Sequence, residues 1–223
     1  MKWILDNPND VIQNCLARGN WFEKDYLDVM SKYCNSDSVI LDVGANIGNH
    51  TVYFSKIVNA KTIYVIEPIV RSYRMLLANI ALNYCHNVNV DHIGLGLGHQ
   101  ECIGYAHAMY GKDNLGATRL LPEPTSTSEG VQIVTGDSIF ENIKLDFIKM
   151  DIEGMEMLAL DGLKNTIKNS RPNIFLEVIE ENKQEFNKWL EDNRYDIVYS
   201  HDQGDVYEEN DPNKTYDYMI VPR

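Results

Sequence analysis

The fold of this chain of 223 residues is decided by the stretch Ser38-Val39-Ile40-Leu41-Asp42-Val43-Gly44-Ala45-Asn46-Ile47-Gly48-Asn49-His50-Thr51. It begins with an apolar run that only Asp42 interrupts, passes through a turn with Gly44 and Gly48, and ends in a helical pattern. An apolar run of this kind is typical of a buried parallel strand. The stretch therefore predicts a strand, a ligand-binding turn (the glycine loop, residues 44–48) and a helix, in that order.

The glycine loop favours one kind of ligand. Its two glycines suit a positive φ or a close approach of a ligand to backbone N–H groups at a helix N-terminus. The spacing is not the G-x-G-x-x-G fingerprint of dinucleotide sites. No lysine lies in the loop and Asp42 adds negative charge, so a cationic or zwitterionic ligand fits better than a polyphosphate. S-adenosylmethionine is such a ligand.

A second apolar strand, residues 62–66, ends at Glu67-Pro68. In nucleoside-binding α/β folds, an acid at the end of the second strand binds the ribose hydroxyls. The alternative is that Glu67 is only a carboxylate at the start of the helix that follows Pro68. Together with the glycine loop, the first interpretation is favoured.

Composition excludes several classes of protein. The formal net charge is −13 without any compensating basic run, which argues against a nucleic-acid partner. The four cysteines are scattered, so neither a zinc site nor a disulfide framework is indicated. No signal peptide and no run of 18 apolar residues is present, which predicts a cytoplasmic protein without a membrane span.

The remaining patterns predict one domain over residues 1–223, with an N-terminal helical cap at about 9–36. Within the cap, Glu23 either reaches the cofactor or is a solvated helix carboxylate.

Helices are expected over 69–83, 155–168 and 181–192, and a third strand over 88–93. Gly94, Gly96 and Gly98 suggest a loop near the adenine, or a simple turn. A strand-like insertion at about 100–135 is expected to supply substrate contacts.

Two further apolar runs have carboxylates at or near their ends. Residues 145–150 lead to Asp151 and Glu153, and residues 173–178 contain Glu177. Ligands of open α/β sheets bind at the carboxyl ends of the strands, so Asp42, Glu67, Asp151 and Glu177 are expected to converge on one rim. Glu153 is either part of that site or a cap of the helix that begins at Met155.

These residues together resemble the FkbM-type methyltransferases. The matching stretches are Leu41 to Gly48, Glu67-Pro68, Asn114-Leu115-Gly116, Asp146 to Glu156 and Pro172 to Val178. The resemblance implies an α/β class I Rossmann-like fold with helices on both faces of a seven-stranded sheet, order 3-2-1-4-5-7-6, in which strand 7 is antiparallel. It also implies transfer of a methyl group from S-adenosylmethionine, commonly to a hydroxyl of a sugar, glycan or small natural product.

Methyl transfer to an alcohol needs removal of the acceptor proton by a base or help from a metal. The predicted catalytic residues are Asp151, Glu153 and Glu177. Asp151 and Glu177 are also candidate ligands of Mg²⁺. His50 and His201 are the histidines best placed to act as the base, although a lone loop histidine is more often a bystander. The predicted cofactor-binding residues are Glu23, Asp42, Gly44, Asn46, Gly48, Thr51, Glu67, Pro68 and Gly94.

Two other classes of function stay open at this point. One is another Rossmann enzyme that uses a nucleotide, such as a dehydrogenase, which the missing G-x-G-x-x-G opposes. The other is a non-catalytic protein that binds S-adenosylmethionine, which the row of acids opposes. Nothing in the sequence specifies the oligomeric state.

Overall fold

The structure is a computed structural model that describes residues 1–108, 118–126, 128–202 and 214–223. The expected motif Asn114-Leu115-Gly116 lies outside these residues. The helices are α1 (Val11–Ala17), α2 (Lys24–Met30), α3 (Asn49–Tyr53), α4 (Val70–Leu82), α5 (Asp137–Phe140), α6 (Glu156–Gly162), α7 (Lys164–Ser170) and α8 (Lys183–Asn193), with a π-helical turn at Phe54–Val58 and a 3-10 turn at Glu180–Asn182. The strands are β1 (Val39–Val43), β2 (Thr62–Ile66), β3 (Val88–Asn89), β4 (Leu95–Leu97), β5 (Cys102–Ala108), β6 (Thr118–Leu121), β7 (Gly130–Val134), β8 (Phe147–Met150), β9 (Asn173–Ile179), β10 (Tyr195–Asp202) and β11 (Thr215–Pro222).

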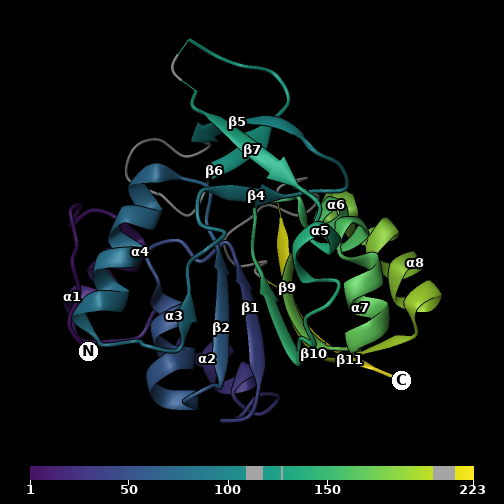
Figure 1. The fold of residues 1–223 in the computed structure, drawn as a ribbon, viewed down its shortest axis with the longest axis horizontal. Coiled ribbons are helices and arrows are strands. Elements are labelled where there is room, and N and C mark those ends of the chain that lie inside the picture. The colour runs from purple at the N-terminus through teal and green to yellow at the C-terminus, as the bar shows by residue number, and fades with distance from the viewer. Residues whose placement is uncertain (109–117, 127, 203–213) are drawn as a thin grey trace.

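The main sheet has seven strands in the order β10-β11-β9-β8-β1-β2-β3 (Figure 1). Strand β11 runs antiparallel to both of its neighbours, and the other neighbouring pairs are parallel. The expected order 3-2-1-4-5-7-6 numbers only the strands of this sheet. The labels in Figure 1 also count the four strands of a second sheet, so in those labels the order is β3-β2-β1-β8-β9-β11-β10.

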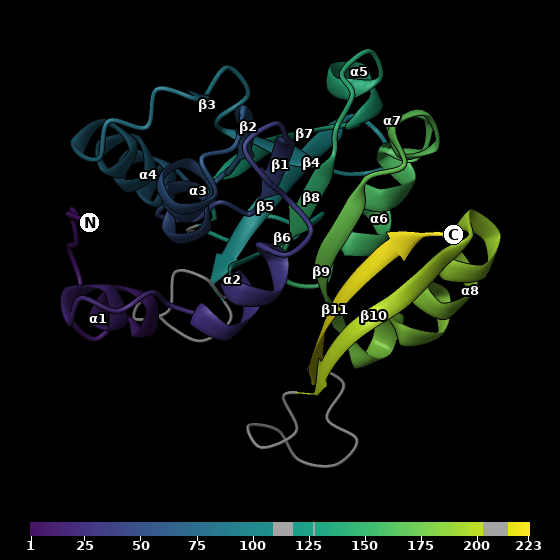
Figure 2. The ribbon, with the colours of Figure 1, turned by 90° about the horizontal axis from the view of Figure 1, so that it is seen from below.

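Helices cover both faces of the main sheet, α2 to α4 on one face and α5 to α8 on the other (Figure 2). Alternation along β1 supplies both layers of the core. Ile40 belongs to the core cluster of the first face, with Leu27 of α2 and Phe54. Leu41 belongs to the core cluster of the second face, with Leu160 of α6 and Phe186 of α8. Side chains of successive strand residues point to opposite faces, so one apolar strand serves both layers.

The second sheet contains four strands in the order β4-β7-β5-β6, and lies across the end of the main sheet (Figure 1). It corrects one expectation from the sequence. The segment with Gly94, Gly96 and Gly98 is not a simple loop, because Gly96 lies within β4. A Cβ on Gly96 would lie 2.9 Å from Leu120 Cδ1, so the glycine lets β6 pack closely over β4.

Two other boundaries differ from the sequence-based expectation. The helix expected over 155–168 is two helices that separate at Leu163. The carboxylate of Asp137 accepts the backbone N–H groups of Asn165 and Thr166, and so caps a new helix from a distant part of the chain. The third strand ends at Asn89, because the Asn89 side chain accepts the N–H of Asp91 and turns the backbone.

Two short helices, α1 and α2, precede β1. Asp10 begins α1 by accepting the N–H of Gln13 at 2.9 Å, which is the role of an N-cap residue. Glu23 precedes α2 in a left-handed conformation with φ of 55°. Among the described residues, no helix combines the length and the apolar character that crossing a membrane requires.

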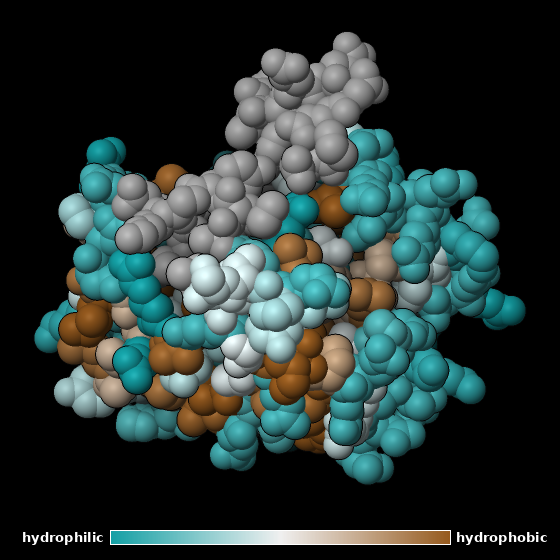
Figure 3. All heavy atoms as spheres, turned by 90° about the horizontal axis from the view of Figure 1, so that it is seen from above, coloured by the Kyte–Doolittle hydropathy of each residue, from teal (hydrophilic) through white to brown (hydrophobic). Residues whose placement is uncertain are grey.

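Figure 3 views the molecule from the end that carries the second sheet. On this face, hydrophilic residues cover much of the described surface, and hydrophobic residues form separate groups.

Candidate active site

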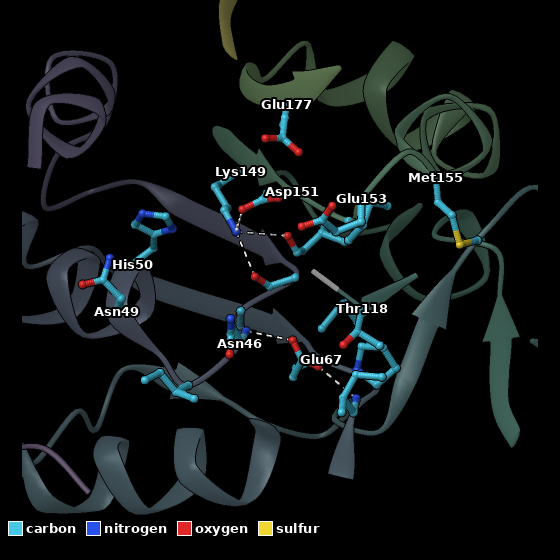
Figure 4. A pocket seen from close by; sticks show the side chains of 18 of the residues that line it. Asn46, Asn49, His50, Glu67, Thr118, Lys149, Asp151, Glu153, Met155 and Glu177 are labelled. Atoms are coloured by element: carbon cyan, nitrogen blue, oxygen red, sulfur yellow. Dashed lines mark hydrogen bonds and ion pairs between the residues drawn. The ribbon is translucent and has the colours of Figure 1, made fainter. Parts of the chain in front are cut away.

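A cavity of about 470 Å³ lies where β1, β2, β8 and β9 end, beside the second sheet (Figure 4). Eight of the predicted site residues line it: Glu23, Gly44, Asn46, Glu67, Pro68, Asp151, Glu153 and Glu177. Four others are not part of its lining: Asp42, Gly48, Thr51 and Gly94. The lining also includes Thr118 and Leu120 of β6, so both sheets build the cavity.

The backbone conformation of the loop requires both of its glycines, and at Gly44 the packing requires one as well. Gly44 has a φ of +76°, and a Cβ there would lie 1.9 Å from the backbone oxygen of Asp151. Gly48 has a φ of +94°, and a Cβ there would lie 2.7 Å from Leu76 Cδ1 on α4. Only glycine adopts these conformations without strain and leaves room for the neighbouring chain. Gly48 therefore seats the start of α3 against α4.

Glu67 holds the glycine loop as well as facing the cavity. Its carboxylate accepts the N–H of Asn46 at 2.8 Å and the N–H of Ile69 at 2.9 Å. The first bond ties the end of β2 to the loop, and the second caps the start of α4. Burial raises the pKa of Glu67 to about 7, although these two N–H groups and Lys149 favour the charged form.

Asp42 does not reach the rim of the sheet, which corrects the expectation that four acids converge there. Its side chain is fully buried, and Oδ2 accepts the Thr51 hydroxyl at 2.6 Å. Asp42 and Thr51 therefore lie beneath the glycine loop and join the end of β1 to α3. The other three acids of that set, Glu67, Asp151 and Glu177, do line the cavity.

Asp151, Glu153 and Glu177 form what we call the carboxylate trio. One oxygen from each residue can be chosen so that all three lie within 4.8 Å of one another. Burial and the nearby Asp151 raise the pKa of Glu153 to about 8. Burial, with Asp151 again adding repulsion, also raises the pKa of Glu177 well above its ordinary value. The trio is thus a concentration of negative charge that holds a proton readily.

Glu153 is not the N-cap of α6, and the carboxylate that binds the turn before this helix is that of Glu156. Glu156 Oε1 accepts the N–H of Ile152 at 3.0 Å and that of Gly154 at 3.1 Å. Glu153 instead takes a left-handed conformation with φ of 57° and turns towards the cavity (Figure 4). The sequence could not separate these two glutamates, because both lie at the start of α6.

The two candidate histidines have different surroundings. His50, on α3, lines the cavity, and its Nε2 lies 3.1 Å from Glu23 Oε2. His201 is outside the cavity lining and pairs through Nδ1 with the Tyr26 hydroxyl at 2.8 Å. Glu23 thus faces a histidine of the site, an arrangement that the sequence analysis did not anticipate.

Sequence reasoning assigned no role to Lys149, although its side chain is only 2% exposed and lies at the centre of the site (Figure 4). Burial alone would lower the pKa of Lys149, but Asp151 and Asp42 together raise it above its ordinary value. A lysine inside the apolar run Phe147 to Met150 was the available signal, since buried lysines are rare unless paired. Thr118, Leu120 and Thr215 carried no such signal, because only the tertiary structure brings them to the cavity.

The order of the main sheet, the loop after its first strand and the acid after its second define an α/β Rossmann-like methyltransferase fold. The chain belongs to the methyltransferase FkbM domain family, whose sequence model matches residues 42–206. No curated protein matches the chain.

Solved structures share this fold at low sequence identity. Methyltransferase FkbM from Methylobacillus flagellatus KT is 17% identical with a TM-score of 0.56, over 83% of this chain and 44% of that one. Precorrin-6y C5,15-methyltransferase from Geobacter metallireducens GS-15 is 12% identical with a TM-score of 0.54, over 91% of both chains. The M1A22 tRNA methyltransferase TrmK of B. subtilis is 13% identical with a TM-score of 0.52, over 88% of this chain and 64% of that one. The present chain thus spans less than half the length of the Methylobacillus protein.

Proposed function

We propose that this chain is an S-adenosylmethionine-dependent methyltransferase that methylates a hydroxyl of a sugar, a glycan or a small natural product. The observation that supports it best is a single cavity that joins the glycine loop and Glu67 to the carboxylate trio. A methyl donor and an acceptor must meet in one enclosed place, with a proton acceptor beside them. Membership of the FkbM family supports methyl transfer.

The cofactor is expected to lie between Glu67 and the glycine loop. Each oxygen of the Glu67 carboxylate accepts one N–H, and a carboxylate oxygen has room for a second donor. The ribose hydroxyls are donors of the right kind. The cationic sulfonium suits a cavity whose lining has five carboxylates (Glu23, Glu67, Asp151, Glu153 and Glu177).

The acceptor is expected beside the carboxylate trio. Methyl transfer forms a bond between the acceptor oxygen and the methyl carbon as the carbon–sulfur bond breaks, and the hydroxyl proton passes to a base. A raised pKa brings a carboxylate close to the range in which a general base works at neutral pH. Glu153 and Glu177 meet this condition, and Asp151 stands between them and Lys149.

The same residues fit a hard cation. Carboxylate oxygens are the ligands that Mg²⁺ and Ca²⁺ prefer, and opposite ligands of such ions are about 4 to 5 Å apart. The oxygens of the trio lie within 4.8 Å of one another, so Asp151 and Glu177 would hold the ion with Glu153 as a third ligand. A bound Mg²⁺ would lower the pKa of the acceptor hydroxyl.

Cofactor binding is the first test. Isothermal titration calorimetry should show micromolar affinity for S-adenosylhomocysteine and no binding of NAD. Binding of NAD alone would instead favour the dehydrogenase class. Transfer of tritium from methyl-labelled S-adenosylmethionine should then be measured with sugars, glycans, metabolite extracts and tRNA. Labelling of tRNA alone would overturn the proposed acceptor class, and with it the expectation from the net charge of −13 that the partner is not a nucleic acid.

The role of the trio is tested by two changes. Asp151 is the third candidate for the base. If the hydroxyl proton passes to Asp151, Asp151→Asn should lower turnover by roughly 100-fold or more, the usual cost of losing a general base. The matched control is Asp161→Asn, on α6 and outside the cavity lining. If Mg²⁺ takes part, EDTA should abolish turnover and Mg²⁺ should restore it. Full activity in EDTA would show that the reaction needs no metal. Unchanged turnover of Asp151→Asn would show that Asp151 is not a catalytic residue.

A further inference from the structure

Lys149 is the only lysine or arginine among the described residues that line the cavity, and it is surrounded by acceptors. Its Nζ donates to the Gly44 carbonyl at 2.8 Å and lies 3.5 Å from the Val43 carbonyl. The same nitrogen lies 3.6 Å from Asp42 Oδ1 and 3.6 Å from Asp151 Oδ2. An ammonium group buried to this degree is tolerated only when it is paired and hydrogen-bonded.

The sheet explains why these groups meet. Lys149 of β8 is the register partner of Asp42 in the parallel strand β1, so both side chains point to the same face. Asp151 follows two residues after Lys149 and returns to that face. The two strand ends are also in close contact, since a Cβ on Gly44 would lie 1.9 Å from the Asp151 oxygen. Lys149 thus bridges the start of the glycine loop and an acid of the trio.

We propose that Lys149 is a positioning residue whose ammonium group holds the glycine loop and Asp151 at a set separation, and thereby aligns the cofactor with the acceptor side of the cavity. This inference rests on the proposed function. Its basis is geometric: one donor atom contacts the loop carbonyl on one side and Asp151 on the other (Figure 4).

The test measures binding of S-adenosylhomocysteine by calorimetry to the wild-type chain, to Lys149→Ala and to the control Lys188→Ala. Lys188 is exposed and pairs with Asp192 on α8, so the control removes a paired lysine far from the cavity. Lys149→Ala should raise the dissociation constant at least ten-fold, and Lys188→Ala should leave it within two-fold. Lys149→Ala with wild-type affinity would overturn the inference.

Chemical rescue separates positioning from packing. The space left by Lys149→Ala opens on the cavity, so propylammonium can enter it and donate hydrogen bonds to Gly44 and Asp151. It should restore most of the lost affinity, whereas tetramethylammonium, which has no N–H, should not. If both cations restored the affinity, Lys149 would act through its charge alone. If neither cation restored it, Lys149 would act through its packing. Either result overturns the inference.

A second variant allows the test to be made if Lys149→Ala does not fold. Lys149→Ala leaves Asp42 as an unpaired buried charge, and Asp42→Asn/Lys149→Ala removes both charges. If the single variant unfolds, the rescue is measured on this double variant with Asp42→Asn as its reference. Equal affinity of these two proteins would overturn the inference. If the wild-type chain itself fails to bind S-adenosylhomocysteine, the proposed function fails first, and the two failures are thereby distinguished.

Discussion

At the scale of single residues, the site depends on backbone conformations that few side chains allow. Gly44 is the clearest case, because it combines a φ of +76° with the close approach of the Asp151 carbonyl. Gly19, which follows α1, has a similar φ of +83° but no atom within 4 Å of the position of a Cβ. The two glycines therefore separate the cost of backbone strain from the cost of crowding.

We expect Gly19→Ala to reduce the free energy of unfolding by about 1 kcal/mol, the usual cost of a left-handed conformation for alanine. Gly44→Ala should reduce it by roughly 3 kcal/mol or more, because strand β8 must also shift to relieve the clash. Urea denaturation of both variants checks this. Equal losses would mean that the contact between Gly44 and Asp151 relaxes freely.

At the scale of elements, the second sheet contributes part of the cavity wall. Leu120 of β6 lines the cavity, whereas its neighbour Leu121 is 40% exposed on the opposite side of the strand. This alternation makes β6 one wall of the proposed acceptor site. The strand belongs to the insertion that the sequence predicted as a source of substrate contacts, a role that stays a prediction.

Leu120→Ala should raise the KM for the acceptor about ten-fold, since loss of a buried leucine contact is worth roughly 1–2 kcal/mol. Its affinity for S-adenosylhomocysteine should stay within about two-fold, because the glycine loop and Glu67 lie on the main sheet. Leu121→Ala, on the same strand, is the matched control and should change neither value. A loss of cofactor affinity equal to the rise in KM would place Leu120 at the cofactor instead.

At the scale of the whole molecule, buried acids make stability depend on pH. Burial raises the pKa of Glu67 and the pKa of Glu156 to about 7 in each case. The backbone N–H groups that donate to these two carboxylates lower the pKa, but burial has the larger effect. The folded state therefore binds protons that the unfolded chain releases above about pH 4.5. This contribution to stability is complete below that pH and is lost as the pH rises through 7.

We expect the free energy of unfolding to be greater at about pH 5.5 than at about pH 8. Each of the two acids should contribute roughly 2 kcal/mol to this difference, since one unit of pKa shift is worth about 1.4 kcal/mol. Denaturant titrations at the two pH values measure it. Glu156→Gln should reduce the difference, and Glu185→Gln, which changes an exposed acid on α8, should not. Greater stability at the higher pH would contradict the sign of these shifts.

Much of this molecule follows from local sequence. Apolar runs and their spacing predict the strands β1, β2, β8, β9 and β11 with the helices between them, because the repeat of each element is written in neighbouring residues. Acids placed after such runs meet at one edge, since parallel strands end on the same side of a sheet. Glu67, Asp151 and Glu177 could therefore be predicted to share a site, and they line one cavity.

What the tertiary structure alone decided depends on contacts between distant residues. Asp137 caps α7, Lys149 reaches Gly44, and Leu120 closes the cavity from a second sheet. The first two contacts join residues that are 29 and 105 positions apart in the chain, so no local pattern encodes them. By itself the sequence determined which groups end the strands. The packing of those strands determined that Asp42 is buried beneath the loop while Asp151 faces the cavity. The reason is that burial depends on what covers a residue rather than on its neighbours in sequence.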